Sequence, residues 1–454
     1  MFKLTDEQNA IINPEKWSSA IIVAKAGSGK TTTIIQRAIN QSEVIIDWKS
    51  IAIISFTNKS VEDIRKKLKF SNAKNIISMT FHSFLMHHIL SFRPLFRNKN
   101  ISFDFDRKVS NLKEWVNYVN TNNKIPVSKD PKKDYLLEGA LLALKQYPYI
   151  QKYLKYKFTA IYIDEAQDNN KLQYDIVKIL LDLDIQVVLV GDENQTIYQF
   201  RGASADAFLK MKEHPKFQDN IYHLTKNFRC HELIDFCANS YTVPTEQNTD
   251  ENKNGIYACK QTELTKIVSY FERKKEGICF LFRGIKGQNN ESNRQIINNY
   301  GLPIITLPDI IVKSNNPQPL TLLFHMFFGS FKEELDFIEY VFPNLPNQQA
   351  KKIIKDLKYT PSAETLTQLN KYALIYEEKD FDEILNVFQN DEARQFYTLD
   401  SIKNFAMTIH SAKGLEFKNV IVMSRDFNNL NYDNSKELFY VACTRAKEKL
   451  IFIN

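Results

Sequence analysis

Short apolar runs alternate with amphipathic segments along the first 90 residues. The runs lie at Ala20–Val23, Ile51–Phe56 and Ile76–Phe81, and a helical pattern follows each of them. Buried parallel strands are continuous apolar runs, and an order of strand and then helix is typical of a parallel α/β sheet. We therefore predict a parallel sheet flanked by helices in this part of the chain.

The same alternation returns further along the chain. It predicts strands at Ala160–Ile163, Val187–Val190 and Tyr222–Leu224. A second set is predicted at Ile256–Cys259, Ile278–Phe282, Ile304–Leu307, Phe405–Ile409, Val420–Met423 and Leu450–Ile453. The pattern thus predicts an α/β protein with two sheet-containing lobes.

Two blocks without this alternation interrupt the lobes. Residues 91–157 are rich in Lys, Tyr and Asn and are predicted to form helices and loops. They hold 14 basic and 6 acidic residues, a net charge of +8, whereas the whole chain carries +7. Residues 319–400 are predicted to form several helices, and their 8 basic and 14 acidic residues give −6. The mild net charge therefore conceals a basic block and an acidic block.

Composition excludes several classes of protein. The chain has 454 residues, 43% hydrophobic and 25% charged, which excludes collagen-like, low-complexity and largely disordered chains. The five cysteines form no CxxC pair, so we expect reduced thiols and no structural zinc. The first ten residues contain no apolar signal region, and the longest apolar run, Leu320–Phe328, is too short to cross a bilayer. We expect a cytoplasmic protein without a membrane span.

The run AKAGSGKTT, residues 24–32, lies between a predicted strand and a predicted helix. Gly27 and Gly29 allow backbone amides to turn toward phosphate oxygens at a helix N-terminus. Lys30 is placed to pair with the β- and γ-phosphates of ATP, and Thr31 to ligate Mg²⁺. This pattern predicts a phosphate-binding loop. Its predicted nucleotide contacts are Ala26, Gly27, Ser28, Gly29, Lys30, Thr31 and Thr32.

A second acidic element follows the strand predicted at 160–163. Asp164 and Glu165 lie in the run YIDEAQD, at the C-terminal end of that strand. Asp164 can hold Mg²⁺ through water, and Glu165 can orient and deprotonate the attacking water. An apolar strand that ends in two acids is a weak signal alone. Together with the phosphate-binding loop it predicts an ATP hydrolysis site.

These two elements, with further motifs in the same order, resemble the UvrD/Rep-type superfamily 1 DNA helicases over nearly the whole chain. The further motifs are LTDEQ (4–8), SFTNKS (55–60), TFHSF (80–84), VGDENQTIYQFRGA (190–203), LTKNFR (224–229), TIHSAKGLEF (408–417) and YVACTRAKEKL (440–450). The resemblance implies two RecA-like P-loop NTPase lobes with parallel sheets, each with a reduced helical insertion. The predicted parts are 1–90 with 158–222, 223–318 with 401–454, the basic insertion 91–157 and the acidic insertion 319–400.

The resemblance also implies roles for residues around the nucleotide. Gln8 would read the adenine, Phe228 would offer a stacking ring, and Glu416 would lie near the ribose. Phe228 stands where the family usually has tyrosine.

Three more catalytic residues follow from the resemblance. Gln195 would sense the γ-phosphate, and Arg229 and Arg445 would be arginine fingers. Phosphoryl transfer needs positive charge over a spreading anion, so arginines from a second lobe make hydrolysis depend on lobe closure. The predicted catalytic set is Lys30, Asp164, Glu165, Gln195, Arg229 and Arg445.

The DNA contacts are predicted in four of the motifs. Movement along a single strand needs aromatic platforms and phosphate contacts rather than recognition of base edges. Phe56 and Phe84 are expected in the core instead. The predicted DNA contacts are Thr57, Asn58, Thr80, His82, Tyr198, Phe200, Arg201 and His410. Phe200 replaces the usual tryptophan and offers a smaller ring.

The compact plan is most similar to the helicase-like subunit of Gabija anti-phage defence systems. Residues 222–230, 410–433 and 439–452 carry this resemblance. It implies DNA as substrate, a role in phage restriction and a nuclease of the OLD type as partner in a hetero-oligomer. The acidic block 319–400 is then either the docking surface for that partner or a solvated helical face.

Two functions from different classes share these residues. The first is an ATP-driven translocase or helicase on single-stranded DNA, expected from the family to move 3′ to 5′. The second is a regulatory ATPase that senses DNA ends or nucleotide and controls a nuclease without processive unwinding. The small size of the two insertions supports the second function, the regulatory ATPase, more strongly than the motifs support it. Unwinding of RNA is less supported, because the motifs resemble those of DNA-acting members.

Overall fold

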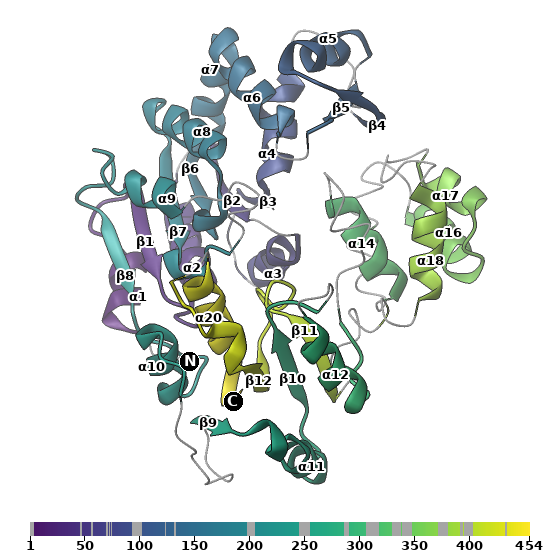
Figure 1. The fold of residues 1–454 in the computed structure, drawn as a ribbon. Coiled ribbons are helices and arrows are strands. Elements are labelled where there is room, and N and C mark those ends of the chain that lie inside the picture. Colours follow the sequence, from purple (N-terminus) through teal and green to yellow (C-terminus); the bar gives the residue numbers. More distant parts are fainter. Residues whose placement is uncertain are drawn as a thin grey trace. The chain divides into compact units, whose positions relative to one another are not determined.

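A computed structural model gives the fold (Figure 1). It describes residues 4–45, 48–55, 58–69, 71, 73, 75–92, 102–122, 124–130, 133–197, 205–244, 255–285, 290–305, 317–328, 337, 347–370, 380–390, 394, 403–431 and 434–454. Contacts between residues divide the chain into two units, Met1–Arg229 and Cys230–Asn454.

Unit 1 contains a six-stranded parallel sheet in the order β3-β2-β6-β7-β1-β8. The strands are β1 (Ala20–Ala24), β2 (Ser50–Ser55), β3 (Ile76–Thr80), β6 (Phe158–Ile163), β7 (Gln186–Gly191) and β8 (Ile221–Leu224). All six were predicted from their apolar runs. Because the strands are parallel, their C-terminal ends share one edge, and this edge carries the phosphate-binding loop and the acidic element.

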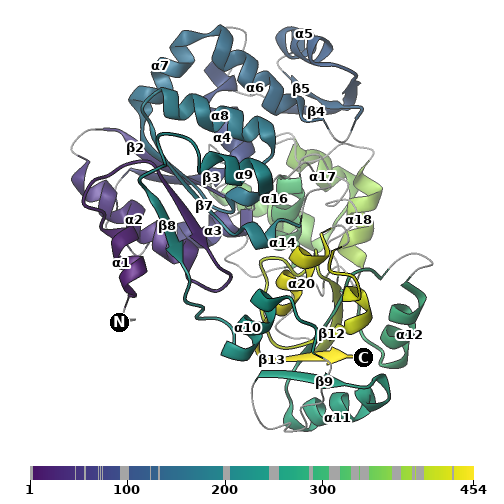
Figure 2. The same cartoon turned by 60° about the vertical axis from the view of Figure 1, so that its left-hand side comes forward.

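Helices cover both faces of this sheet, as Figures 1 and 2 show. The described helices around it are α1 (Asp6–Ile12), α2 (Lys30–Val44), α3 (Asn58–Lys69), α4 (Phe81–His88), α8 (Lys171–Asp182) and α9 (Ala205–Met211). Neighbouring residues of one strand pack into different cores: Ile21 belongs to one buried cluster and Ile22 to another. This alternation explains why the strands are apolar at every position.

The basic insertion contains a pair of strands that the sequence pattern did not predict. β4 (Ser102–Val109) and β5 (Lys124–Ser128) pair in parallel, with α5 (Leu112–Asn122) between them in the chain. The expectation of helices and loops alone is therefore wrong here. The physical reason is that charged residues occupy much of β4, so no continuous apolar run marks it.

Trp115 of α5 holds the strand pair against the rest of the insertion. Its side chain is fully buried, and its indole Nε1 donates a hydrogen bond to the carbonyl of Pro126, 3.1 Å away. A Cβ atom at Gly139 of α6 (Tyr135–Gln146) would lie 2.4 Å from the Trp115 ring, so only glycine admits the ring there. After α6, helix α7 (Pro148–Lys157) returns the chain to β6.

Unit 2 contains a five-stranded parallel sheet in the order β11-β10-β12-β13-β9. The strands are β9 (Gly255–Cys259), β10 (Ile278–Phe282), β11 (Asn404–Thr408), β12 (Phe417–Met423) and β13 (Ala446–Ile453). Helices α10 (Glu232–Ser240), α11 (Leu264–Lys274), α12 (Glu291–Asn299) and α20 (Ser435–Cys443) accompany it. The strand predicted at Ile304–Leu307 is reduced among the described residues to one bridge, from Ile304 to Ala406.

The described part of the acidic block is helical, as predicted. It consists of α14 (Pro317–Phe328), α16 (Asn347–Tyr359), α17 (Ala363–Asn370) and α18 (Phe381–Gln389). Phe324, Leu357, Leu369 and Ile384 are buried in a core of the block's own. The two parallel sheets with surrounding helices confirm the predicted α/β fold class. In the described parts of both units, no helix has the length and apolarity to span a bilayer.

Candidate nucleotide site

The loop between β1 and α2 has the geometry of a phosphate cradle. Gly27 and Gly29 both adopt the left-handed backbone region, with φ of 74° and 79°. A Cβ atom at Gly27 would lie 2.4 Å from Oδ1 of Asn227. Glycine is therefore required at Gly27 by both backbone conformation and space. The loop ends at Lys30, the first residue of α2, so the helix N-terminus points its amides toward the cradle.

Ser28 and Gln8 line the cradle from inside. Ser28 is 1% exposed, and among the residues that the structure describes its hydroxyl Oγ has no hydrogen-bond partner. A buried hydroxyl without a partner fits a site that receives an oxygen-rich ligand. The Nε2 of Gln8 donates to the carbonyl of Ser28 over 3.3 Å, while its Oε1 accepts from the N–H of Thr5 in a capping box. Gln8 thus links α1 to the loop.

The acidic strand end meets the loop directly. Lys30 Nζ lies 2.7 Å from Oε2 of Glu165, and the hydroxyl of Thr31 donates to Oδ2 of Asp164 over 3.1 Å. Asp164 is itself fixed because its N–H donates to the carbonyl of Ile54 at the end of β2. The two elements predicted separately from the sequence therefore form one cluster.

Burial and charge shape the protonation of this cluster. Burial, and then the neighbouring charge of Glu165, raise the pKa of Asp164 to about 6. Burial disfavours the charged form of Lys30, but the carboxylates of Glu165, Asp164 and Asp192 outweigh it and raise the lysine pKa. Shifted pKa values of this kind cluster at functional sites, so this cluster is a candidate for one.

Glu165 has an unusual backbone. Its φ is 53°, in the left-handed region that residues other than glycine rarely adopt. Such a conformation costs on the order of 1–3 kcal/mol and persists where the surrounding structure fixes it. Here the fixed direction places the carboxylate between Lys30 and the side chain of Gln167.

Two polar residues of this cluster were not assigned from the sequence, although both lie inside the quoted motifs. Gln167 donates from Nε2 to Oε2 of Glu165 over 2.6 Å and accepts the N–H of Asp192 at Oε1 over 3.0 Å. The Asp192 carboxylate accepts from Nε2 of Gln195 over 2.7 Å. The available signal was a polar side chain shortly after each of two apolar strands: Gln167 lies four residues after the end of β6, and Asp192 directly follows β7.

The segment after β8 lies against the phosphate-binding loop. The N–H of Phe228 donates to the carbonyl of Gly27 over 2.8 Å, and Oδ1 of Asn227 accepts from the N–H of Arg229 over 2.7 Å. Phe228 is 53% exposed, and its stacking role remains a prediction. The division by contacts places Arg229 at the end of unit 1, whereas the sequence division placed it in the second lobe.

Comparison with known proteins identifies the family. A family model of the UvrD/REP helicase N-terminal domain matches residues 4–129 and 97–216. A model of the UvrD-like helicase C-terminal domain matches residues 403–453, and the two together cover more than half of the chain. The chain belongs to the UvrD/Rep helicase family.

The relatives of this chain differ in how much of their own length aligns with it. Gabija protein GajB from Bacillus cereus (strain VD045) is 28% identical, over 95% of this chain and 92% of its own. A probable DNA helicase II homologue from Mycoplasma pneumoniae is 24% identical, over all of this chain and 84% of its own. The ATP-dependent DNA helicase PcrA from Staphylococcus aureus is 26% identical over 74% of this chain. The alignment covers 53% of PcrA, about half of its length.

In unit 2 of this helicase-family chain, Arg445 is buried among backbone acceptors. Its Nε donates to the carbonyl of Val441 over 3.0 Å, and Nη1 donates to the carbonyl of Leu415 over 2.9 Å. Glu416 pairs with Lys447 at 2.5 Å. His410 is half-buried in the turn after β11. The finger role of Arg445, the ribose contact of Glu416 and the DNA contact of His410 remain predictions.

The predicted DNA contacts of the helicase motifs are described only in part. Thr57, Tyr198, Phe200 and Arg201 lie outside the described residues, as do Phe56 and the side chain of Asn58. Phe84 is fully buried, which confirms its expected place in the core.

Thr80 and His82 are both held by other residues. Thr80 is the N-cap of α4, and its hydroxyl accepts the N–H of Ser83. His82 Nε2 lies 3.0 Å from Oδ2 of Asp134, which in turn is the N-cap of α6. Burial opposes charge on the His82 ring, but the carboxylate of Asp134 outweighs it and raises the histidine pKa. This link between the motif and the insertion could not be read from the sequence.

The site fits ATP and Mg²⁺. The left-handed glycines, the Lys30 ammonium and the Ser28 hydroxyl, which has no hydrogen-bond partner in the described part of the chain, match a triphosphate. The hydroxyl of Thr31 and the carboxylate of Asp164 are the oxygen ligands that Mg²⁺ prefers, and they already lie 3.1 Å apart.

Proposed function

We propose that this chain hydrolyses ATP when it binds single-stranded DNA and uses the cycle to move along or unwind DNA in the 3′ to 5′ direction. The observation that carries the proposal is the 2.7 Å contact of Lys30 with Glu165 across 135 residues of chain. It joins the phosphate-binding loop to the acidic strand end in a member of a helicase family.

In this proposal the residues of the cluster divide the work of phosphoryl transfer. Lys30 exchanges Glu165 for the β- and γ-phosphates, and that exchange frees the Glu165 carboxylate to orient water and accept its proton. Thr31 and Asp164 would hold Mg²⁺, which neutralises charge on the phosphates. Gln195, tied to Asp192, would sense the γ-phosphate.

The remaining nucleotide contacts come from segments around the loop. Gln8 would read the adenine, Phe228 would stack on it, and Glu416 would approach the ribose. Arg229 and Arg445 would stabilise the charge of the transition state. Since Arg445 donates to Val441 and Leu415 in this structure, its finger role requires that it exchange these carbonyls for phosphate oxygens.

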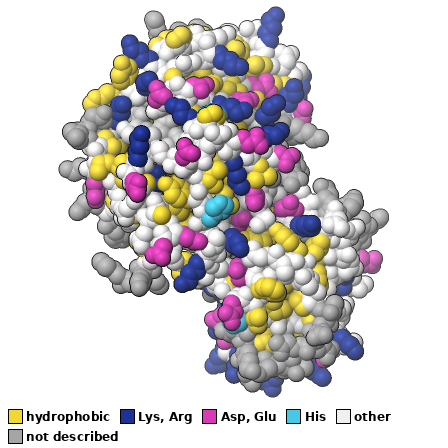
Figure 3. Space-filling model, turned by 90° about the vertical axis from the view of Figure 1, so that its left-hand side faces the viewer, with side chains coloured by type: hydrophobic (Ala, Val, Ile, Leu, Met, Phe, Trp, Pro, Cys, Tyr) yellow, Lys and Arg dark blue, Asp and Glu magenta, His cyan; other side chains and the backbone are white. Residues whose placement is uncertain are grey.

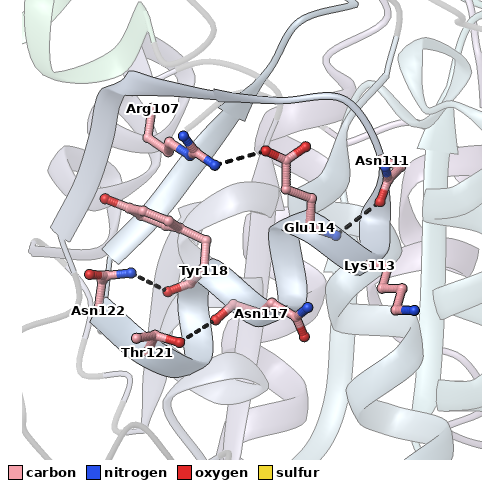
Figure 4. Close-up of a pocket in the computed structure, with 8 residues that line it drawn as sticks. All are labelled: Arg107, Asn111, Lys113, Glu114, Asn117, Tyr118, Thr121 and Asn122. Carbon is pink, nitrogen blue, oxygen red and sulfur yellow. Dashed lines mark hydrogen bonds and ion pairs between the residues drawn. The ribbon is translucent and has the colours of Figure 1, made fainter.

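The DNA contacts are proposed along the motifs and the basic insertion. Figure 3 shows Lys and Arg side chains spread over one face of the molecule and interspersed with acidic ones. In the insertion, a shallow pocket of about 540 Å³ lies along α5 (Figure 4). There Arg107 pairs with Glu114 at 2.9 Å, so part of the positive charge is satisfied internally. Lys113, Lys124 and Lys129 are exposed and available to phosphates.

A second candidate function is supported by the extent of the similarity. The alignment covers 92% of Gabija protein GajB but 53% of PcrA. We infer that the chain is the cytoplasmic ATPase subunit of a Gabija-type defence complex with an OLD-type nuclease. In that complex its cycle would control the nuclease without processive unwinding, with the acidic block 319–400 as a docking surface.

One set of assays tests both candidates. ATP hydrolysis is measured with and without single-stranded DNA, and strand separation is measured on duplexes with a 3′ tail or a 5′ tail. Hydrolysis with unwinding only from the 3′ tail supports the first function. Hydrolysis without unwinding, together with ATP-dependent control of a nuclease encoded beside this chain, supports the second. No hydrolysis under any of these conditions overturns both.

A further inference from the structure

The carboxylate of Glu7 ties the first helix of the chain to the segment that follows β8. Its Oε2 accepts the N–H of Thr225 over 2.9 Å, and its Oε1 accepts the hydroxyl of the same residue over 2.6 Å. The two residues lie 218 positions apart in the chain. Helix α1 and strand β8 lie side by side in Figures 1 and 2. One side chain therefore holds one residue of the neighbouring segment with both of its oxygens.

These bonds favour the charged form of Glu7. The hydroxyl of Thr225, and then its backbone N–H, lower the pKa of the Glu7 carboxyl below its usual value. A charged acceptor forms stronger hydrogen bonds than a neutral one, and two bonds to one residue fix direction as well as distance. The pair therefore fixes Thr225 more firmly than a single neutral hydrogen bond would.

The two elements that Glu7 joins carry the two predicted adenine contacts. Gln8 follows Glu7 directly and is predicted to read the adenine, whereas Phe228 comes three residues after Thr225 and is predicted to stack on the base. The N–H of Phe228 donates to the carbonyl of Gly27 over 2.8 Å. The segment is thus bonded to Glu7 at its start and to the phosphate-binding loop near its end.

The relative position of these two contacts bears on which base the site selects. Stacking on a ring accepts every base, because every base has a π-face. Hydrogen bonds from an amide distinguish one base edge from another, and a site built to make them rejects a base that leaves them unmade. A shift of Phe228 relative to Gln8 would keep the stacking and weaken the hydrogen bonds. Selectivity would then fall more than general nucleotide affinity.

We propose that Glu7 is a positioning residue that sets the place of Phe228 relative to Gln8, and thereby the preference of the site for adenine over guanine. This inference rests on the proposed ATPase function, which assigns ATP to this site. It adds a residue outside the predicted nucleotide contacts that determines the choice of base.

The test compares the full chain with its Glu7→Ala variant. Isothermal titration calorimetry in the presence of Mg²⁺ measures the Kd of each protein for ATP and for GTP, and this measurement does not require hydrolysis. We expect the Kd for ATP to rise about tenfold in the variant, the order expected when a charged hydrogen-bond acceptor is removed. The Kd for GTP should change less than about twofold. The preference for ATP should therefore fall about tenfold.

Two further variants test the contact itself. Glu7→Gln keeps one oxygen that accepts a hydrogen bond from Thr225, so it should retain most of the preference for ATP. Thr225→Val removes the hydroxyl and keeps the shape of the side chain, so it should lose part of the preference. Glu7→Ala should cost less in the Thr225→Val background than in the wild type, because the two side chains act through one interaction.

Asp6→Ala is the matched control. Asp6 is an exposed acid in the same first turn of α1, so its removal changes the charge at the helix N-terminus in the same way. Among the hydrogen bonds of the described residues, those to Thr225 come from Glu7 and not from Asp6. This variant should keep the wild-type Kd values for both nucleotides.

The outcomes separate this inference from the proposed function. Equal weakening of ATP and GTP binding by Glu7→Ala, or the same loss of preference in Asp6→Ala, overturns the inference, because Glu7 then only supports α1. If the wild type binds ATP in preference to GTP but does not hydrolyse it, the ATPase function fails and the binding data still decide the role of Glu7. If the wild type binds both nucleotides equally, the inference fails even where hydrolysis is observed.

Discussion

The Nζ atom of Lys30 lies 2.7 Å from Oε2 of Glu165, although strand β7 separates the two strands that these residues follow. Lys30 begins the helix after β1, and Glu165 follows β6. Two strand spacings amount to roughly 10 Å, a distance that a lysine side chain and a glutamate side chain span together. The contact therefore depends on the order of the strands in the sheet.

Removal of either partner of this pair should stop ATP turnover. Lys30→Ala removes the charge expected on the phosphates, and Glu165→Gln removes the proton acceptor, worth about 10²- to 10⁴-fold in rate. DNA affinity, measured by fluorescence anisotropy, should stay close to that of the wild type. Glu213→Gln, at an exposed position, is the control. Normal hydrolysis by either site variant would show that the active site lies elsewhere.

Asp164→Asn should stabilise the metal-free protein at pH 7. In the folded protein the pKa of Asp164 is raised to about 6. The contribution of this carboxyl group to the free energy of unfolding therefore falls as the pH rises from 4 through 6. The neutral amide avoids this loss, and we expect a gain on the order of 1 kcal/mol. Urea unfolding in EDTA at pH 7 and at pH 4 measures it: the gain should be present at pH 7 and vanish at pH 4. Equal stability changes at both values would contradict the assigned protonation.

Asp134→Asn should lower the pKa of His82. The Asp134 carboxylate raises this pKa. The ion pair between Asp134 and His82 therefore stabilises the fold fully below about pH 6.5, and this contribution is lost as the pH rises through the raised pKa of His82. Asparagine keeps an oxygen for the N–H groups of Leu136 and Leu137 at the start of α6. NMR titration of the histidine signals measures the effect. His88, whose pKa burial lowers to about 4, is the internal control and should not move.

Reversal of charge at Lys113, Lys124 and Lys129 should weaken DNA binding. These exposed lysines belong to the basic insertion, and removal of one phosphate interaction reduces the slope of log K against log salt by roughly 0.7 for a single strand. The matched control reverses Lys266, Arg273 and Lys274 on α11 of unit 2, with the same change in net charge. An unchanged affinity and salt slope in the insertion variant would make this block a solvated face.

Local sequence pattern predicts much of this fold. Apolar runs such as 20–23 and 187–190 predict the strands because both faces of a parallel sheet are covered. The same criterion misses β4, whose charged residues hide its extended backbone. Trp115, which packs under the strand pair, is an ordinary helical residue in the sequence and acquires its role only from Gly139 and Pro126.

The sequence alone determined the chemical groups of the site: the glycines of the loop, Lys30 and the two acids after β6. These are read from local order, because a strand, a tight turn and a helix N-terminus are formed by neighbouring residues. Only the tertiary structure decided which groups meet. The contacts of Gln167 with Asp192 and of His82 with Asp134 join residues 25 and 52 positions apart. Sheet order and helix packing set such distances, and no local pattern encodes them.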